Sequence, residues 1–166
     1  RIAHCPKSNA KFAHGIAPLQ KFKQAGINVG LGSDSVASNN TCDLIEEARF
    51  ASLLHRSIAR SAEIFTPEEM LRMMTIDGAR ALRMESMIGS LEANKQADLV
   101  VIDLSHTHTT PHYDPMATII WSCSARDVKL TMVKGQVIYD GLRVMTIDEA
   151  AIQKSIATIQ SKLSVA

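Results

Sequence analysis

The feature that most constrains the fold is a helical pattern that runs into an unbroken apolar segment at residues 27–31. In the stretch IAPLQKFKQAGINVGLGS, apolar side chains recur at helical spacing at Ile16, Leu19, Phe22 and Ala25. Pro18 suits a first helical turn, and Gly26 can end the helix in a left-handed conformation. The apolar segment shows no polar alternation, which predicts a strand buried on both faces, as in a parallel sheet. The chain is therefore expected to open as a loop, a helix, a buried strand and a second loop, in an α/β fold.

One carboxylate, Asp34, follows this strand at the point where the loop begins. In α/β sheets and barrels, ligands bind beyond the carboxyl ends of the strands. A carboxylate on such a rigid support can bind a metal ion or transfer a proton. Aspartate in a loop also commonly caps the next turn through its side chain. The local sequence leaves both roles open.

The segment HCPKSN offers a second polar cluster. Ser8 and Asn9 can hydrogen-bond a polar ligand, and His4 could polarise or bind one. The alternative is a loop whose polar groups satisfy its own turns.

A third polar cluster lies in the segment SHTHTTPHYDP, which contains His106, His108 and His112. No cysteine or acid completes a tetrahedral metal set in this segment, so we expect an exposed loop.

Two more helices follow the Asp34 loop. Residues 43–60 place apolar side chains on one helical face, with Glu47 and Arg49 mainly outside it, and Asp43 favours the helix start. Thr66 and Glu69 form a capping box for the next helix, whose methionines we expect in the core and which Gly78 could divide in two.

The pattern changes after about residue 89. ADLVVIDL predicts a strand, and DVKLTMVKGQVIYDG predicts a hairpin that turns at Lys134 and Gly135. A final amphipathic helix is expected to start at a capping box of Thr146 and Glu149.

Composition excludes several classes of function. With 18 basic and 17 acidic residues and only 4% aromatic residues, nothing indicates binding to nucleic acid or to an anionic membrane. No apolar run approaches the roughly 20 residues of a transmembrane helix. The cysteines Cys5, Cys42 and Cys123 fit neither a disulfide framework nor a CxxC zinc site, which favours the cytoplasm.

Several segments, in order along nearly the whole chain, resemble the C-terminal part of the amidohydrolase superfamily. They are HCPKSNAKFAHGIAPL, AGINVGLGSDSVASNN, DLIEEARFASLL, DGARAL, IGSLEANKQADLVVIDL, YDPMATIIW and DVKLTMVKGQVIYDG. The resemblance is to the chlorohydrolase and aminohydrolase group, which includes methylthioadenosine/S-adenosylhomocysteine, guanine and 8-oxoguanine deaminases and s-triazine hydrolases. Within the group, the methylthioadenosine/S-adenosylhomocysteine deaminases look nearest.

The resemblance implies a fold and a division of the chain. Residues 1–86 would supply the last βα units of a metal-dependent hydrolase TIM barrel, a fold of about 250 residues when complete. Residues 87–145 would supply C-terminal strands of a small composite β-sandwich, and residues 146–166 a terminal amphipathic helix. Arg83 stands where relatives often carry glycine, which concerns only the local helix end.

The resemblance also implies roles for individual residues. Asp34 would be a metal ligand and a proton shuttle, and HCPKSN would border the pocket, with His4, Ser8 and Asn9 as substrate-binding residues. The metal would be zinc, or alternatively iron, and would activate water for hydrolytic deamination of an aminopurine-type heterocycle. Chloride would leave instead of ammonia in dehalogenating relatives.

This sequence departs from the family in its metal ligands. The HxH pair, the further histidines and the glutamate that relatives carry on earlier strands are missing, and His106 and His108 cannot replace them. We therefore expect the 166-residue chain alone to be inactive and not to retain the metal. The missing barrel neighbours suggest a fragment boundary at Arg1 and self-association as a homo-oligomer. A truncated, non-catalytic binding module is the alternative from another class.

Overall fold

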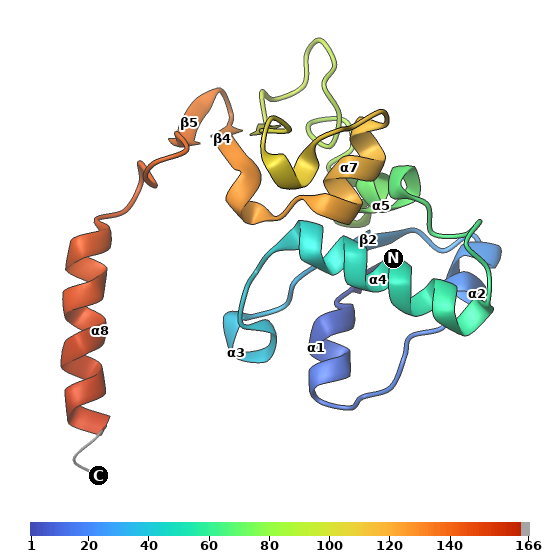
Figure 1. Ribbon diagram of the computed structural model, residues 1–166, viewed down its shortest axis with the longest axis horizontal. Coiled ribbons are helices and arrows are strands. Elements are labelled where there is room, and N and C mark those ends of the chain that lie inside the picture. Colours follow the sequence, from blue (N-terminus) through green and yellow to red (C-terminus); the bar gives the residue numbers. More distant parts are fainter. Residues whose placement is uncertain (164–166) are drawn as a thin grey trace.

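The computed structural model describes residues 1–163 and contains a helix-rich body, two small sheets and a helix that stands apart (Figure 1). The strands are β1 (Ile2–His4), β2 (Val29–Leu31), β3 (Leu99–Ile102), β4 (Val128–Val133) and β5 (Gln136–Tyr139). The helices are α1 (Pro6–Lys11), α2 (Leu19–Gln24), α3 (Val36–Asn39), α4 (Leu44–Ala59), α5 (Pro67–Met74), α6 (Ile76–Leu82), α7 (Pro115–Ser122) and α8 (Glu149–Leu163), with 3₁₀ turns at Thr107–Thr109 and Ala125–Asp127. Among residues 1–163, no helix has the length and apolar character needed to cross a membrane.

The first two strands form a parallel pair. Ile2 pairs with Val29 and His4 pairs with Leu31, so the carboxyl ends of both strands lie at one edge. The buried strand predicted at residues 27–31 is confirmed in a shorter form, and Gly26 has the expected left-handed φ of 67°. The prediction of a loop before the first helix was wrong, because that segment contains β1 and α1. A three-residue strand is too short to show a pattern, and its pairing partner lies far along the chain.

Helix α6 lies directly against β2. A Cβ built on Gly30 would come within 2.8 Å of the Gly78 Cα, so the two backbones touch where neither residue has a side chain. The helical segment does divide, but at Thr75, which separates α5 from α6. Gly78 lies inside α6 without breaking the helix, and the missing side chain of Gly30 lets β2 approach its Cα closely.

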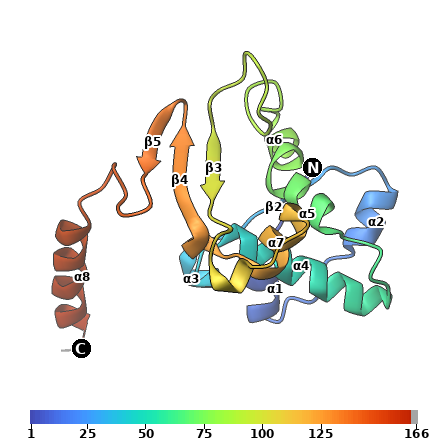
Figure 2. The ribbon, with the colours of Figure 1, turned by 45° about the horizontal axis from the view of Figure 1, so that its top comes forward.

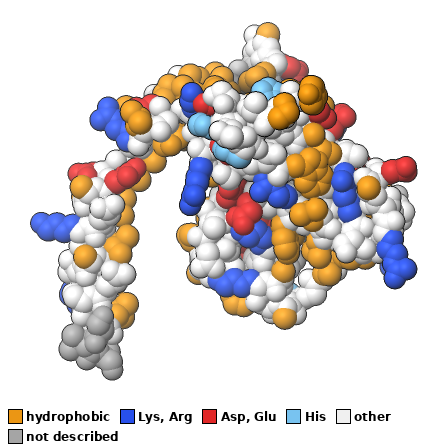
Figure 3. Space-filling model, in the orientation of Figure 1, with side chains coloured by type: hydrophobic (Ala, Val, Ile, Leu, Met, Phe, Trp, Pro, Cys, Tyr) orange, Lys and Arg blue, Asp and Glu red, His pale blue; other side chains and the backbone are white. Residues whose placement is uncertain are grey.

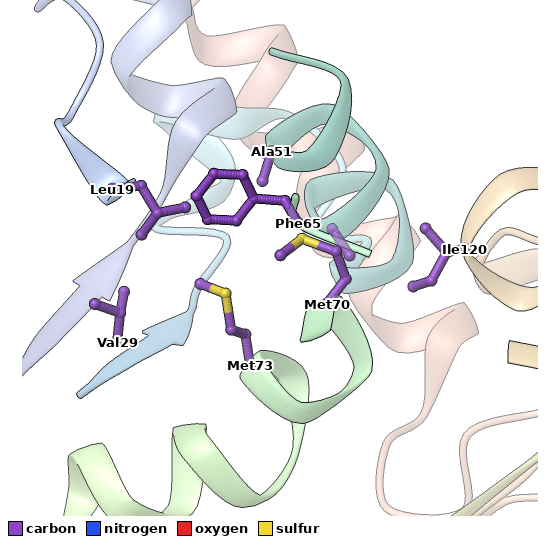
Figure 4. Packing of buried hydrophobic residues seen from close by; sticks show 8 residues of the cluster. Leu19, Val29, Ala51, Phe65, Met70, Met73 and Ile120 are labelled. Carbon is purple, nitrogen blue, oxygen red and sulfur yellow. The ribbon is translucent and has the colours of Figure 1, made fainter. Parts of the chain in front are cut away.

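The core lies between β2 and the helices α2, α4, α5 and α7 (Figure 4). It contains Leu19, Val29, Ala48, Ala51, Phe65, Met70, Met73 and Ile120. The predicted helix starts are confirmed: Asp43 accepts the backbone N–H groups of Ile45 and Glu46, and Thr66 and Glu69 form a capping box. Met70 and Met73 are buried as expected.

Helix α7 brings a late part of the chain back to this core. Ile120 is fully buried against the core, and Arg49 of α4 donates from Nε to the Ile120 carbonyl oxygen at 2.7 Å. No helix was predicted here, although Asp114 followed by Pro115 is a start signal. The Asp114 carboxylate accepts the N–H of Met116 at 2.9 Å.

Strands β3, β4 and β5 form an antiparallel sheet beside the helices (Figure 2). The predicted hairpin is confirmed, with Lys134 and Gly135 both at positive φ in the turn. Helix α8 begins at Glu149, and Asp148 accepts the Ala151 N–H at 3.0 Å, so the capping box predicted at Thr146 was wrong. No residue of α8 up to Leu163 is buried, and Figure 3 shows hydrophobic side chains along the edge of α8 that faces the body.

Candidate functional site

Asp34 lies in the loop after β2, at the edge where both parallel strands end. Its Oδ2 accepts hydrogen bonds from the hydroxyl groups of Ser8 and Ser38, both at 2.7 Å, and its Oδ1 accepts the Ser35 N–H at 2.8 Å. The side chain is solvent-exposed. Ser8 comes from α1, after β1, so the parallel pairing of β1 and β2 places its hydroxyl beside Asp34. The carboxylate is thus fixed by donors and open to a ligand.

These hydrogen bonds determine the charge of Asp34. The hydroxyl of Ser8, then that of Ser38, then the Ser35 N–H lower the pKa of the Asp34 carboxyl below its ordinary value. The group is therefore ionised at neutral pH, as a metal ligand must be. Ser35 holds the N-cap position of α3, and the Asp34 carboxylate itself bonds the Ser35 N–H and the Ser38 hydroxyl at this turn.

His4 is buried and faces the helical layer. Its Nε2 lies 3.2 Å from the Nε2 of His55 on α4, and both side chains are almost fully buried. Burial, followed by the proximity of His55, lowers the pKa of His4 to about 4, and burial also lowers the pKa of His55. Both imidazoles are therefore neutral at pH 7, so one ring N–H can donate to the other ring.

Asn9 and His4 share a pocket of about 360 Å³ between α1, the following loop and α4. The lining includes Pro6, Ala13, Ile16 and Leu54, and it does not include Asp34. Of the residues predicted to bind substrate, Ser8 contacts Asp34, whereas His4 and Asn9 line this separate pocket. The substrate-binding role of all three stays a prediction.

Two residues near Asp34 were missed at the level of the sequence. Glu47 was expected mainly outside the apolar face of α4, yet it is fully buried and accepts a hydrogen bond from Asn39. A signal existed, because Glu47 lies four residues before Ala51, a core residue, on the same helical face, and Asn39 ends the short helix that follows Asp34.

The histidine-rich segment lies in a turn, as expected. His108 Nε2 lies 2.8 Å from the Asp127 Oδ1, and the His106 and His108 rings stack. Residues 1–163 contain no group of three or more His, Cys, Asp or Glu side chains that could hold a metal ion. Asp34 can therefore offer this chain's own carboxylate to a metal but does not form a complete site.

Known proteins extend these observations. The chain is 44% identical over 148 residues to a 5-methylthioadenosine/S-adenosylhomocysteine deaminase of Pyrococcus horikoshii, which covers 89% of this chain and 35% of the relative. It also superposes on an adenosine deaminase from Xanthomonas campestris with bound zinc, with a TM-score of 0.93 and 32% identity, over 99% of this chain and 37% of that one. A zinc complex of atrazine chlorohydrolase from Arthrobacter aurescens gives a TM-score of 0.85 and 28% identity, over 94% and 35% of the two chains.

The chain thus spans about a third of the length of the relatives it matches. The model of the amidohydrolase family matches residues 1–138, which is most of the sequence. The α/β fold of an amidohydrolase agrees with both kinds of comparison. This chain belongs to the amidohydrolase family.

Proposed function

We propose that this chain supplies Asp34 to the active site of a metal-dependent hydrolase that deaminates an aminopurine-type heterocycle. The observation that carries the proposal is the position of Asp34: an exposed, ionised carboxylate at the end of β2, held by Ser8, Ser35 and Ser38. The names of the relatives, deaminases of methylthioadenosine, S-adenosylhomocysteine and adenosine, support the substrate class.

Zinc suits the donor chemistry of this residue, and the superposed adenosine deaminase and chlorohydrolase both contain it. Carboxylate oxygen is an accepted zinc ligand, but zinc sites use several protein ligands, and the described part of this chain offers Asp34 as one. When bound, zinc lowers the pKa of water and supplies hydroxide near neutral pH. We therefore expect the chain alone to lose metal and to be inactive.

The hydrogen bonds of Asp34 suit a group that gains and loses a proton. A serine hydroxyl can donate to a carboxylate, and after rotation it can accept from a carboxylic acid. Ser8 and Ser38 can therefore remain bonded to Oδ2 in both protonation states of Asp34. The Ser35 N–H can only donate, so it keeps favouring the ionised form at Oδ1.

The proposed function requires a larger framework than this chain. We propose that residues 1–86, with β1 and β2, form the last βα units of a TIM barrel, and that residues 87–145 contribute strands to a composite β-sandwich. Residues 146–166 would be the terminal helix, of which the last three lie outside the described residues. The parallel pairing of β1 with β2 and the antiparallel sheet of β3–β5 support this division.

An apolar cleft of about 760 Å³ between the helices and the β3–β5 sheet also fits an incomplete framework. Its lining includes Leu31, Leu71, Met74, Ile88, Leu99 and Val133. Contiguous apolar surface that is open to solvent is a feature of protein–protein interfaces. Self-association of this chain across such surfaces is part of the proposal.

Other activities of the same kind are the runner-up readings. A guanine-like base or an s-triazine would use the same Asp34, and an s-triazine hydrolase of Gordonia rubripertincta is 41% identical over 138 residues. The alternative is a binding module without catalytic activity, because Asp34 is the one metal ligand that the described part of the chain offers.

The test is a chimera in which this chain replaces the matching C-terminal third of the Pyrococcus deaminase. Ammonia release is measured with 5′-methylthioadenosine, adenosine and guanine, and chloride release with a chlorinated s-triazine, for the chimera and for the isolated chain. We expect turnover of an aminopurine nucleoside by the chimera and none by the isolated chain. A folded, zinc-loaded chimera that releases ammonia from none of these compounds would contradict the proposal.

A further inference from the structure

Glu47 is a carboxylate in the interior of the protein, in the first turn of α4, with 0% of its surface exposed. Burying a carboxylate costs free energy unless its oxygens are satisfied. Burial raises the pKa of Glu47 above its ordinary value. The nearby cation of Lys7 pairs with Glu46 instead, at 2.6 Å between Nζ and Oε2. The buried carboxylate of Glu47 is therefore satisfied by hydrogen bonds rather than by an ion pair.

One carboxylate oxygen of Glu47, Oε2, binds the residue next to Ser8. The Lys7 backbone N–H donates to Glu47 Oε2 at 3.3 Å. The next residue, Ser8, donates from its hydroxyl to Asp34 Oδ2 at 2.7 Å. Fixing the backbone of Lys7 therefore fixes the origin of the Ser8 side chain, which is itself 5% exposed.

The other carboxylate oxygen of Glu47, Oε1, binds the residue next to Ser38. The Asn39 side-chain amide donates to Glu47 Oε1, and it also donates to the Ser33 carbonyl oxygen at 2.7 Å. Ser38, the residue before Asn39, donates from its hydroxyl to Asp34 Oδ2 at 2.7 Å. Asn39 thus links Glu47 to both sides of the Asp34 loop.

The loop needs such external support. Asp34 has a φ of 60°, in the left-handed region that residues other than glycine rarely adopt. Residues in this conformation persist when the surrounding structure determines them. The local bond from the Ser35 N–H to Asp34 lies within the loop and cannot orient the loop relative to the strands.

We propose that Glu47 is the positioning residue for Asp34. One buried carboxylate holds, through the chain neighbours Lys7 and Asn39, both serine hydroxyls that converge on Asp34 Oδ2. The catalytic meaning of this arrangement rests on the proposed function of Asp34, whereas the arrangement itself concerns this chain alone.

Glu47→Gln is the informative substitution, because it keeps the shape of the side chain. Glutamine has one acceptor oxygen and one donor NH₂ group, and both partners of Glu47 are donors. One of the two hydrogen bonds is therefore lost, whichever way the glutamine amide is oriented. Glu63→Gln is the control, since Glu63 is exposed and follows the C-terminal end of α4, whereas Glu46 bonds Lys7 and Thr41, and Thr41 bonds Asn39.

The first readout is amide hydrogen exchange by NMR in this chain without metal. We expect the Ser35 amide to exchange about tenfold faster in the Glu47→Gln variant, since losing a hydrogen bond to a charged group has an effect of that order. The amide of Ala51, in the core part of α4, should be unchanged, and Glu63→Gln should change neither amide. A folded Glu47→Gln protein with unchanged Ser35 exchange would overturn the proposal.

If Glu47→Gln does not fold, the unmodified protein still decides the question. A scalar coupling across the hydrogen bond between the Asn39 side-chain nitrogen and the Glu47 carboxyl carbon is expected, and its absence overturns the proposal.

The active chimera supplies the readout that a purely structural role would not change. There we expect Glu47→Gln to lower kcat with little change in KM, and an unchanged kcat overturns the positioning role. Because the exchange and coupling measurements need neither metal nor substrate, failure of the proposed function would appear separately, as an inactive chimera with the hydrogen bonds of Glu47 intact.

Discussion

The Ser8 hydroxyl donates to Asp34 Oδ2 at 2.7 Å and thereby joins the segment after β1 to the segment after β2. Two residues that are distant in sequence meet because the parallel strands end at the same edge. The depressed pKa of Asp34 follows from this contact before any other.

Replacing Asp34 with Asn tests the central residue directly. In the chimera, we expect at least about a 100-fold loss of ammonia release and reduced zinc content, since an amide is a poorer ligand than a carboxylate and cannot take up the proton. Metal analysis and steady-state kinetics measure both effects. Glu63→Gln, at an exposed position, serves as the control. An Asp34→Asn chimera with full activity would remove Asp34 from the mechanism.

The buried pair of His4 and His55 should make the protein sensitive to acid. The unfolded chain protonates His4 near pH 6.5, whereas the folded chain does so only near pH 4. The contribution of neutral His4 to the unfolding free energy is therefore fully present above about pH 6.5. It is lost as the pH decreases toward 4, by up to about 3 kcal/mol. Urea unfolding at several pH values measures this loss. His4→Gln should flatten the profile and the exposed His112→Gln should not; equal slopes in all three proteins would contradict the assignment.

The contact between Gly30 and Gly78 should tolerate no side chain on the strand. Gly30→Ala places a methyl group 2.8 Å from the Gly78 Cα, and we expect a loss of about 1–3 kcal/mol in unfolding free energy. Gly78→Ala is the comparison, because its Cβ would meet Met73 O at 3.3 Å and alanine favours a helix; its effect should stay within about 1 kcal/mol. Urea unfolding of both variants measures these changes. If Gly30→Ala were as stable as the unmodified protein, the two backbones could separate without cost.

Asp43 should stabilise more than the start of α4. Its Oδ1 accepts the N–H groups of Ile45 and Glu46, and its Oδ2 accepts the Ala125 N–H at 2.8 Å. We expect Asp43→Ala to cost about 2 kcal/mol, from the lost cap and the unpaired Ala125 donor.

The control for this prediction is Asp148→Ala at the start of α8. Since no residue of α8 up to Leu163 is buried, the loss of the bond from the Ala151 N–H should leave global unfolding nearly unchanged. Equal effects of both substitutions on the urea midpoint would contradict the link between Asp43 and Ala125.

Self-association should appear in sedimentation equilibrium at micromolar concentration as a mass above 18.1 kDa. The exposed apolar side chains of α8 and the lining of the apolar cleft are the surfaces involved. Ile156 lies on the apolar stripe of α8 and is 49% exposed, so Ile156→Lys should lower the mass if α8 takes part. A single species of 18.1 kDa for the unmodified chain would refute self-association.

The elements that the sequence predicts well are those with local signals. The capping residues Asp43 and Thr66, the turn at Lys134 and Gly135, and the helical terminator Gly26 all act within a few residues of their own position. Strand β1 was missed because a three-residue strand has no measurable period. Helix α7 was missed although Asp114 and Pro115 form a start signal for it.

The site was predictable only in part, for a related reason. Asp34 stands out because a lone acid follows a buried strand. The hydrogen bonds of Ser8 and the burial of Glu47 depend on which strands pair and on how α4 lies over the loop, and those are long-range contacts. The His4–His55 contact likewise joins β1 to a distant helix.

The return of α7 to the core has a consequence for how this polypeptide could be cut. Residues after the loop at 90–96 are anchored to the earlier half by Ile120 and by the Arg49 bond to its carbonyl oxygen. A protease that cleaves in that loop would therefore leave two pieces that stay together until denaturant is added. The residue composition changes near residue 87, but the segments before and after this boundary would unfold together rather than as two independent domains.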